Sequence, residues 1–258
     1  MYHMDLFNDD RLVTRWEDGN RSFLKPPYIP TNREPGKKTK DGYLKQLRKG
    51  ERIFSNAKLE NDKCMFITLT TRDECSEKEI NSHFRSFYRS VKRASDDVEY
   101  LKALDSHQKG SRFHLHIIFQ FKNGIPLING KKMDKKWVSK HWKYSSLKAI
   151  NVQYTYNAWG CLDYIVSPKL KNALSSEDGY VKFSKYTRLI TTSRNFRFEE
   201  PVKCFEVETL DEVKAIIEKY KEVFREKYGY EPFMRTHKAK WIKNGKQYSK
   251  DYYWHLHP

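Results

Sequence analysis

The segment Phe113–Phe121 alternates between apolar and other residues, and it constrains the fold more than any other part of the chain. Phenylalanine, leucine and isoleucine occupy all of its odd positions. In a β-strand these positions share one face, because successive side chains point to opposite sides. His114 and His116 then lie side by side on the other face, with Gln120 beyond them. The pattern predicts a strand that buries one face and presents two imidazoles on the other.

The preceding segment, Val98–Ser106, is predicted to pair with this strand as an antiparallel hairpin. With Lys109-Gly110 at the centre of a tight turn, Asp105 lies directly opposite His114. Directly opposed residues point to the same face, so this carboxylate converges with the two imidazoles. Such a ligand set, with open coordination positions, suits Mg²⁺ or Mn²⁺ acting on a phosphate. We therefore predict a divalent metal site formed by Asp105, His114 and His116.

Other interpretations of these residues stay open. The same three side chains would also suit the wet face of an amphipathic hairpin, where they would only be solvated. His107 shares the face of Asp105 but lies closer to the turn, so we place it outside the ligand set. A second His-x-His motif, His255-Leu256-His257, lacks a following apolar strand and is not expected to bind a metal.

Further helix and strand patterns surround the hairpin. Capping boxes at 76–79 and 209–212 predict the starts of two helices, and Asn157 is a candidate N-cap for a third. The apolar face of the first helix is Ile80, Phe84, Phe87 and Val91, and that of the last is Val213, Ile216, Ile217, Tyr220, Val223 and Phe224. The remaining predicted elements are strands at 64–71, 149–155 and 186–194, a loop or turn at 126–133 and a helix at 134–142. This order predicts an α+β fold, with a central antiparallel sheet flanked by helices.

Three motifs occur in a fixed order along the chain. They are Phe66-Ile67-Thr68-Leu69-Thr70, then His114-Leu115-His116 with Asp105 upstream, then Tyr164 within Leu162-Asp163-Tyr164-Ile165-Val166-Ser167-Pro168-Lys169. In this order they resemble the motifs of the HUH endonucleases, which include rolling-circle replication initiators of plasmids and phages, relaxases and single-strand transposases. The resemblance covers roughly residues 60–195. It implies a sheet whose central hairpin carries the metal and a helix that brings a tyrosine over it.

The resemblance also implies a mechanism. Tyr164 would attack a DNA phosphodiester and form a 5′-phosphotyrosyl intermediate, and Lys169 could assist by its charge. Viral members of the family usually carry lysine three residues after the tyrosine, where this chain has Ser167. Tyr164 has rivals as the nucleophile in Tyr154, Tyr156, Tyr180 and Tyr186.

The charge balance agrees with a nucleic-acid partner. Lysine and arginine number 50 against 33 acidic residues, a net charge of +17, which favours contact with phosphate backbones. Aromatic residues among these cations can stack on unpaired bases. We expect single-stranded origin DNA as the partner, with Arg188 and Arg194 on its backbone. No long apolar segment indicates a membrane partner, and the chain lacks a GxxxxGK[ST] motif, so unwinding would need a separate helicase.

The sequence divides into a basic N-terminal arm (1–60), a nicking domain (61–200) and a C-terminal helix with a basic aromatic extension (201–258). Its four cysteines are widely scattered, which is typical of reduced thiols in a cytoplasmic protein. The leading hypothesis is an enzyme that nicks and rejoins DNA at a replication origin. Alternatives are a transposase or relaxase of the same superfamily, or a nucleic-acid-binding protein without catalysis. The oligomeric state stays open.

Overall fold

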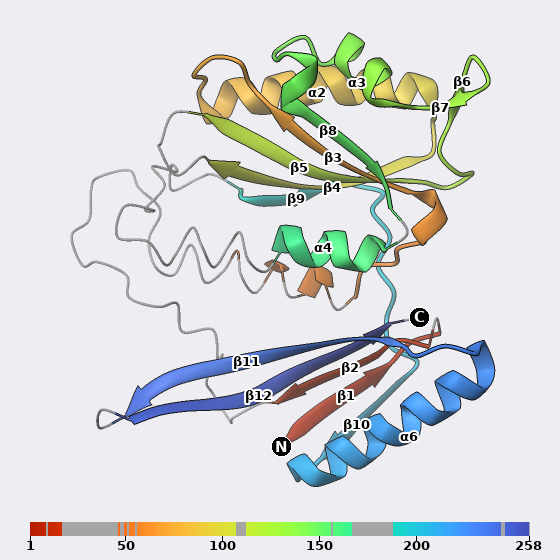
Figure 1. Ribbon diagram of the computed structural model, residues 1–258, viewed down its shortest axis with the longest axis vertical. Coiled ribbons are helices and arrows are strands. Elements are labelled where there is room, and N and C mark those ends of the chain that lie inside the picture. Colours follow the sequence, from red (N-terminus) through yellow and green to blue (C-terminus); the bar gives the residue numbers. More distant parts are fainter. Residues whose placement is uncertain are drawn as a thin grey trace. The chain divides into compact units, whose positions relative to one another are not determined.

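The computed structural model describes residues 1–8, 10–16, 46, 49–50, 52–54, 56–106, 112–155, 157–166, 188–243 and 246–257. The chain forms two compact units. One spans Pro26–Phe198, and we call it the His-pair unit. The other combines Met1–Lys25 with Glu199–Pro258, and we call it the terminal unit. Figure 1 shows a five-stranded sheet in each of them.

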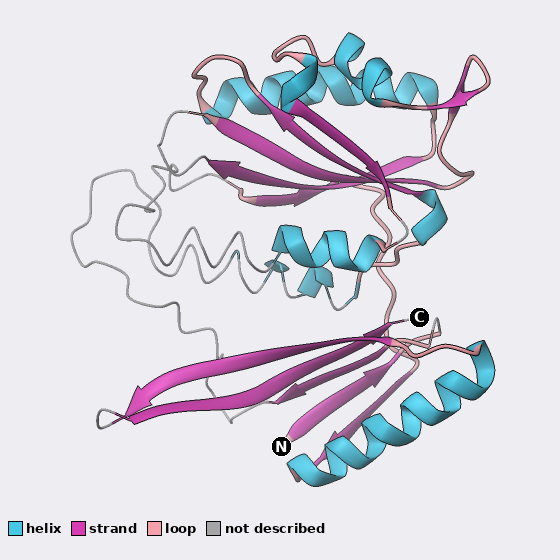
Figure 2. Cartoon of the chain, in the orientation of Figure 1, coloured by secondary structure: helices cyan, strands magenta, loops and turns pink. Residues whose placement is uncertain are grey.

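The His-pair unit is built on an antiparallel sheet with the strand order β8-β3-β5-β4-β9. Its strands are β3 (Cys64–Thr70), β4 (Val98–Ser106), β5 (Phe113–Phe121), β8 (Ile150–Tyr154) and β9 (Ile190–Thr192). Its helices are η1 (Asn61–Lys63), α2 (Glu77–Ala94), α3 (Lys135–His141), η2 (Leu147–Ala149) and α4 (Ala158–Val166). Figure 2 shows α2 and α3 on one face of the sheet and α4 on the other. The predicted α+β class is therefore confirmed.

Helix α2 covers the apolar face of the central strand. Its capping box is present, with the Ser76 side chain accepting from the Glu79 N–H and the Glu79 side chain accepting from the Ser76 N–H. The predicted stripe of the helix is buried throughout. Phe87 contacts Phe119 of β5 with ring centroids 6.2 Å apart. Because Phe119 occupies an odd position, the histidines of β5 lie on the opposite face, toward α4.

The connections differ from the sequence-based expectations at two places. The expected loop at 126–133 contains a small hairpin of β6 (Leu127–Ile128) and β7 (Lys131–Lys132). Its turn uses Asn129 and Gly130 at positive φ, a conformation that these two residue types adopt most easily. The strand expected at 186–194 is shorter, and only Ile190–Thr192 pairs with β4. The expected tight turn at Lys109-Gly110 lies outside the described residues.

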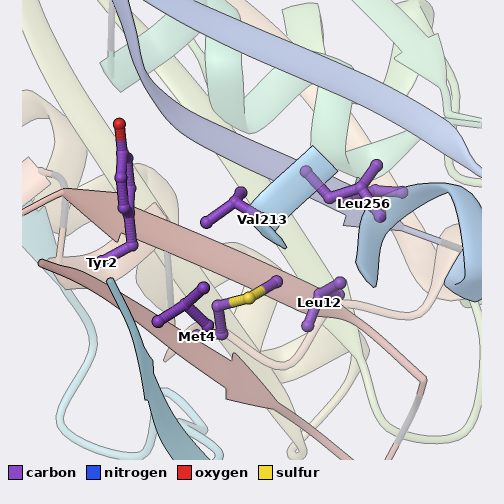
Figure 3. Packing of buried hydrophobic residues seen from close by; sticks show 7 residues of the cluster. Tyr2, Met4, Leu12, Val213 and Leu256 are labelled. Carbon is purple, nitrogen blue, oxygen red and sulfur yellow. The ribbon is translucent and has the colours of Figure 1, made fainter. Parts of the chain in front are cut away.

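The terminal unit has a second antiparallel sheet, which the sequence patterns did not predict. Its strand order is β10-β1-β2-β12-β11. The elements are β1 (Tyr2–Leu6), β2 (Leu12–Trp16), β10 (Lys203–Val207), α6 (Leu210–Tyr228), β11 (Phe233–Lys243) and β12 (Lys246–His257). The two N-terminal strands thus belong to the sheet of residues 199–258. Figure 3 shows their buried side chains beside those of α6 and β12; the core of this unit is Tyr2, Met4, Leu12, Val207, Val213, Ile217 and Leu256.

Helix α6 begins at the predicted capping box, in which Thr209 and Glu212 satisfy each other's backbone N–H groups. It ends at Gly229 in the left-handed region, the usual helix stop. Val223 was expected on the buried face of this helix and is 53% exposed, so that expectation is wrong. Among the helices of the described residues, none is both long enough and apolar enough to cross a membrane.

A buried lysine beneath α2 should make the stability of this protein depend on pH. Burial lowers the pKa of Lys102 from 10.5 to about 8, although its Nζ donates to Asn81 Oδ1 at 2.5 Å and lies 4.5 Å from the centre of the Phe84 ring. The folded state thus holds this proton less tightly than the unfolded state. The free energy of unfolding should therefore rise as pH increases from about 8 to about 10.5.

Lys102→Met should remove this penalty and raise the free energy of unfolding at pH 7 by about 1–3 kcal/mol. It should also flatten the rise between pH 8 and pH 10.5. Urea unfolding at several pH values measures both effects, with the exposed Lys92→Met as the matched control. A Lys102→Met protein that is less stable at pH 7 and keeps the wild-type slope would contradict this account.

Candidate functional site

The two histidines and Asp105 occupy adjacent ranks on the face of the sheet that α4 covers. The register of β4 and β5 pairs Asp105 with His114 and Ala103 with His116, so the predicted hairpin alignment is confirmed. On the other side of β5, β3 places Thr70 opposite His114 and Thr68 opposite His116. The polar side chains therefore form two short rows across three neighbouring strands.

His116 is the central group of this site. It is only 3% exposed, and its Nε2 lies 3.7 Å from Asp105 Oδ2. Its Nδ1 forms a hydrogen bond with Thr68 Oγ1 at 3.1 Å. If Nδ1 carries the proton and donates to Thr68, Nε2 keeps its lone pair toward Asp105, which is the state that metal binding requires. Sequence reasoning noted the threonines of 66–70 but missed this contact, which follows from the pairing of β3 with β5.

The spacing of Asp105 and His116 fits a shared cation. A separation of 3.7 Å is too long for a hydrogen bond. Metal–ligand distances are about 2.1 Å for nitrogen and oxygen donors, so one ion can contact two such atoms up to about 4.2 Å apart. His114 is farther away, with its ring centroid 6.0 Å from that of His116. Within the described ranges, no three His, Cys, Asp or Glu side chains already form a metal-binding group.

Tyr164 lies beside His116. Its ring centroid is 5.4 Å from the His116 ring with the planes at 88°, and 6.0 Å from the Phe66 ring at 89°. Helix α4 positions it, because Leu162 and Ile165 are fully buried while Tyr164 keeps 44% of its surface exposed. The predicted N-cap also holds, since Asn157 Oδ1 accepts from the Gly160 N–H at 2.6 Å. An exposed phenol on a fixed helix can meet a substrate that lies on this face.

The other candidate tyrosines and the candidate lysine separate clearly from Tyr164. In β8, Tyr154 points to the opposite face of the sheet, and its hydroxyl donates to the Met133 carbonyl at 3.1 Å. The remaining candidates lie outside the described residues; these are Tyr156, Tyr180, Tyr186 and Lys169.

The two candidate DNA-binding arginines lie at different ends of β4. Arg188 precedes Leu189, whose carbonyl accepts from the Leu104 N–H at 2.8 Å, so it is near the Asp105 end. Arg194 follows Ser193, whose N–H donates to the Tyr100 carbonyl at 2.9 Å, toward the other end of the strand. Both side chains are exposed. The structure therefore brings Arg188 toward the histidine pair and leaves Arg194 away from it.

A lysine that sequence reasoning missed accompanies Arg188. Lys49 Nζ donates to the Ile190 carbonyl at 2.9 Å. Burial and then the nearby Arg188 charge lower the pKa of Lys49. Two cations that repel each other beside a carboxylate form a region suited to an anion such as phosphate. Lys49 is distant in sequence from the three motifs, so no local pattern could have identified it.

The fold and the site can be compared with known proteins. Searches of curated proteins and of solved structures found no match to this chain. Residues 64–167, which include the threonine strand, both histidines and Tyr164, match the model of a family of replication-associated proteins, the ORF2 type, and over this stretch the chain is similar to that family.

Proposed function

We propose that this protein is a replication initiator that nicks and rejoins single-stranded DNA at an origin, with Tyr164 as the nucleophile. The observation that carries the proposal is the placement of an exposed tyrosine ring 5.4 Å from the ring of His116. The Nε2 of this histidine is in turn 3.7 Å from Asp105. All three residues lie within the segment that is similar to replication-associated proteins.

The reaction is a phosphoryl transfer from DNA to tyrosine. Tyr164 Oη attacks the phosphorus of one phosphodiester, and the bond from phosphorus to the 3′ oxygen breaks. The phenol loses its proton, the departing 3′ oxygen gains one, and the phosphate remains on Tyr164 at the 5′ end of the downstream strand. The reverse reaction, with a 3′-hydroxyl as the nucleophile, restores the phosphodiester and releases the enzyme.

Asp105, His114 and His116 would hold a divalent cation, Mg²⁺ or Mn²⁺, that neutralises charge developing on the scissile phosphate. His114 completes this set once its ring turns toward the other two groups. Thr68 fixes the ring orientation of His116 through its hydrogen bond. Phe66 packs edge-on against Tyr164 and holds its ring near the substrate face.

The surroundings of the site would hold the DNA strand. Lys49 and Arg188 attract its backbone at the Asp105 end of β4. Lys169 adds positive charge shortly after the nucleophile, and Arg194 contacts the strand farther from the reacting phosphate. The duplex at the origin would be opened in the cytoplasm by a separate helicase.

A labelled-strand assay tests this function. Purified protein with Mn²⁺ is mixed with a pool of single-stranded oligonucleotides of random sequence, labelled at the 3′ end in one sample and at the 5′ end in another. We expect the 3′ label alone to migrate with the protein on a denaturing gel, because tyrosine keeps the downstream fragment. A protein carrying the 5′ label would refute the proposed polarity.

A nucleic-acid-binding protein without catalysis is the second candidate. One observation favours it, namely that no three-ligand metal group is preformed among the described residues. It predicts binding of the same oligonucleotides with no covalent product in either Mg²⁺ or Mn²⁺. The denaturing gel therefore separates the two candidates directly.

A further inference from the structure

The long hairpin of the terminal unit extends past its own sheet. Strand β12 pairs with β2 only through Tyr253–Leu256, whereas its pairing with β11 continues to Lys243 opposite Lys246. In the part of the chain that the structure describes, residues 238–243 and 246–251 pair only with each other. Figure 1 shows β11 and β12 running on beyond the end of β2. We call this two-stranded extension, about 20 Å long, the ribbon.

The register sorts the ribbon positions into two faces. A shift between His237 and Lys238 resets the alternation, and from there onward opposed residues share a face. One face has the register pairs Lys238 with Asp251, Lys240 with Ser249 and Ile242 with Gln247. The other face has Ala239 with Lys250, Trp241 with Tyr248 and Lys243 with Lys246, and we call it the aromatic face.

The aromatic face has an unbalanced charge. Its lysines, Lys243, Lys246 and Lys250, have no acidic residue at any position of the same face, whereas Lys238 on the other face is opposite Asp251. Like charges placed directly opposite each other destabilise a strand pair, so Lys243 and Lys246 favour a partner that neutralises them. The partner suited to this face is therefore an anion that extends along the ribbon.

The aromatic pair narrows the choice of anion. Trp241 and Tyr248 occupy directly opposed positions between the lysine positions. Aromatic residues between cations bind single-stranded nucleic acid, because bases stack on the rings while phosphates meet the charges. Paired bases inside a duplex do not offer their flat faces to such rings. We propose that the aromatic face of the ribbon binds single-stranded DNA, separately from the histidine pair.

This inference takes its choice of DNA from the proposed function, but its test does not depend on cleavage. Binding of a fluorescently labelled oligothymidylate is followed by anisotropy in EDTA, where metal-dependent nicking cannot occur. A failure of the ribbon to bind would leave the nicking assay unaffected. A failure of nicking would likewise leave this binding measurement interpretable.

Two charge-matched double variants give the decisive comparison. Lys243→Gln with Lys246→Gln removes two charges from the aromatic face, and Lys238→Gln with Lys240→Gln removes two from the other face. We expect the first to weaken binding about tenfold and to reduce the dependence of log K on log salt by about 1.4, and the second to change affinity less than about twofold. Equal losses in both variants would overturn the proposal, because they would indicate attraction by net charge alone.

The aromatic pair is tested on its own. Trp241→Ala should weaken oligothymidylate binding about tenfold, whereas the neighbouring Ile242→Ala, on the other face, should leave the affinity unchanged. Thermal unfolding curves that match wild type show that each variant is folded, and Tyr248→Ala replaces Trp241→Ala if the latter is unfolded. Unchanged binding in the folded aromatic variant, or tighter binding of wild type to duplex than to single-stranded DNA, would overturn the proposal.

Discussion

Tyr164→Phe is expected to lose the covalent protein–DNA adduct by about a thousandfold or more, because phenylalanine lacks the oxygen that attacks phosphorus. The fold should be unaffected, since 44% of the Tyr164 surface is exposed and the ring edge that packs on Phe66 remains. The amount of 3′-labelled DNA that migrates with the protein on a denaturing gel measures the loss.

Tyr154→Phe is the matched control for this experiment. It removes the same hydroxyl group from a tyrosine in the same unit, but that hydroxyl faces the Met133 carbonyl on the opposite side of the sheet. It should form the adduct at the wild-type rate. An adduct that persists in Tyr164→Phe would move the nucleophile to Tyr156, Tyr180 or Tyr186.

His116→Ala and Asp105→Asn should each reduce nicking by roughly a hundredfold or more, even at high Mn²⁺. These two residues provide the atoms 3.7 Å apart that a single cation can join, so the loss of either leaves the phosphate charge without its stabiliser. His114→Ala should act in the same direction. A titration of nicking rate against Mn²⁺ concentration measures the effect.

Two further variants make the metal experiment specific. Thr68→Val keeps the shape of the side chain but removes its hydrogen bond to His116, so it should need about tenfold more Mn²⁺ and recover at saturation. His141→Ala removes a histidine that stacks on Trp137 of α3, away from the site, and should behave as wild type. If His116→Ala showed the wild-type response to Mn²⁺, the proposed metal site would be wrong.

The central hairpin was predictable because its information is local. Alternation over Phe113–Phe121 and a short connection determine both the buried face and the register, so Asp105 opposite His114 followed from the sequence. The capping boxes before α2 and α6 were equally local signals. The contact of Thr68 with His116 required one further register, and the position of Lys49 beside Arg188 required the complete fold.

The second sheet was missed for physical reasons. Tyr2 pairs with Val207, and no local pattern marks a partner so distant along the chain. The ribbon is rich in lysine, a residue that is depleted in strands, so its composition does not favour strand. The buried Lys102 was also unexpected, since lysine rarely lies in a core.

The strand order of the terminal unit has a consequence for its synthesis. Strands β1 and β2 lie between β10 and β12, so residues made first become the middle of a sheet whose flanks are made last. On the ribosome, Tyr2 and Met4 must wait for Val207 and Leu256 to emerge before they can be buried. The His-pair unit needs nothing beyond Phe198 and can fold earlier. The half of the protein with the proposed chemistry would thus be assembled while its other half was still an open chain.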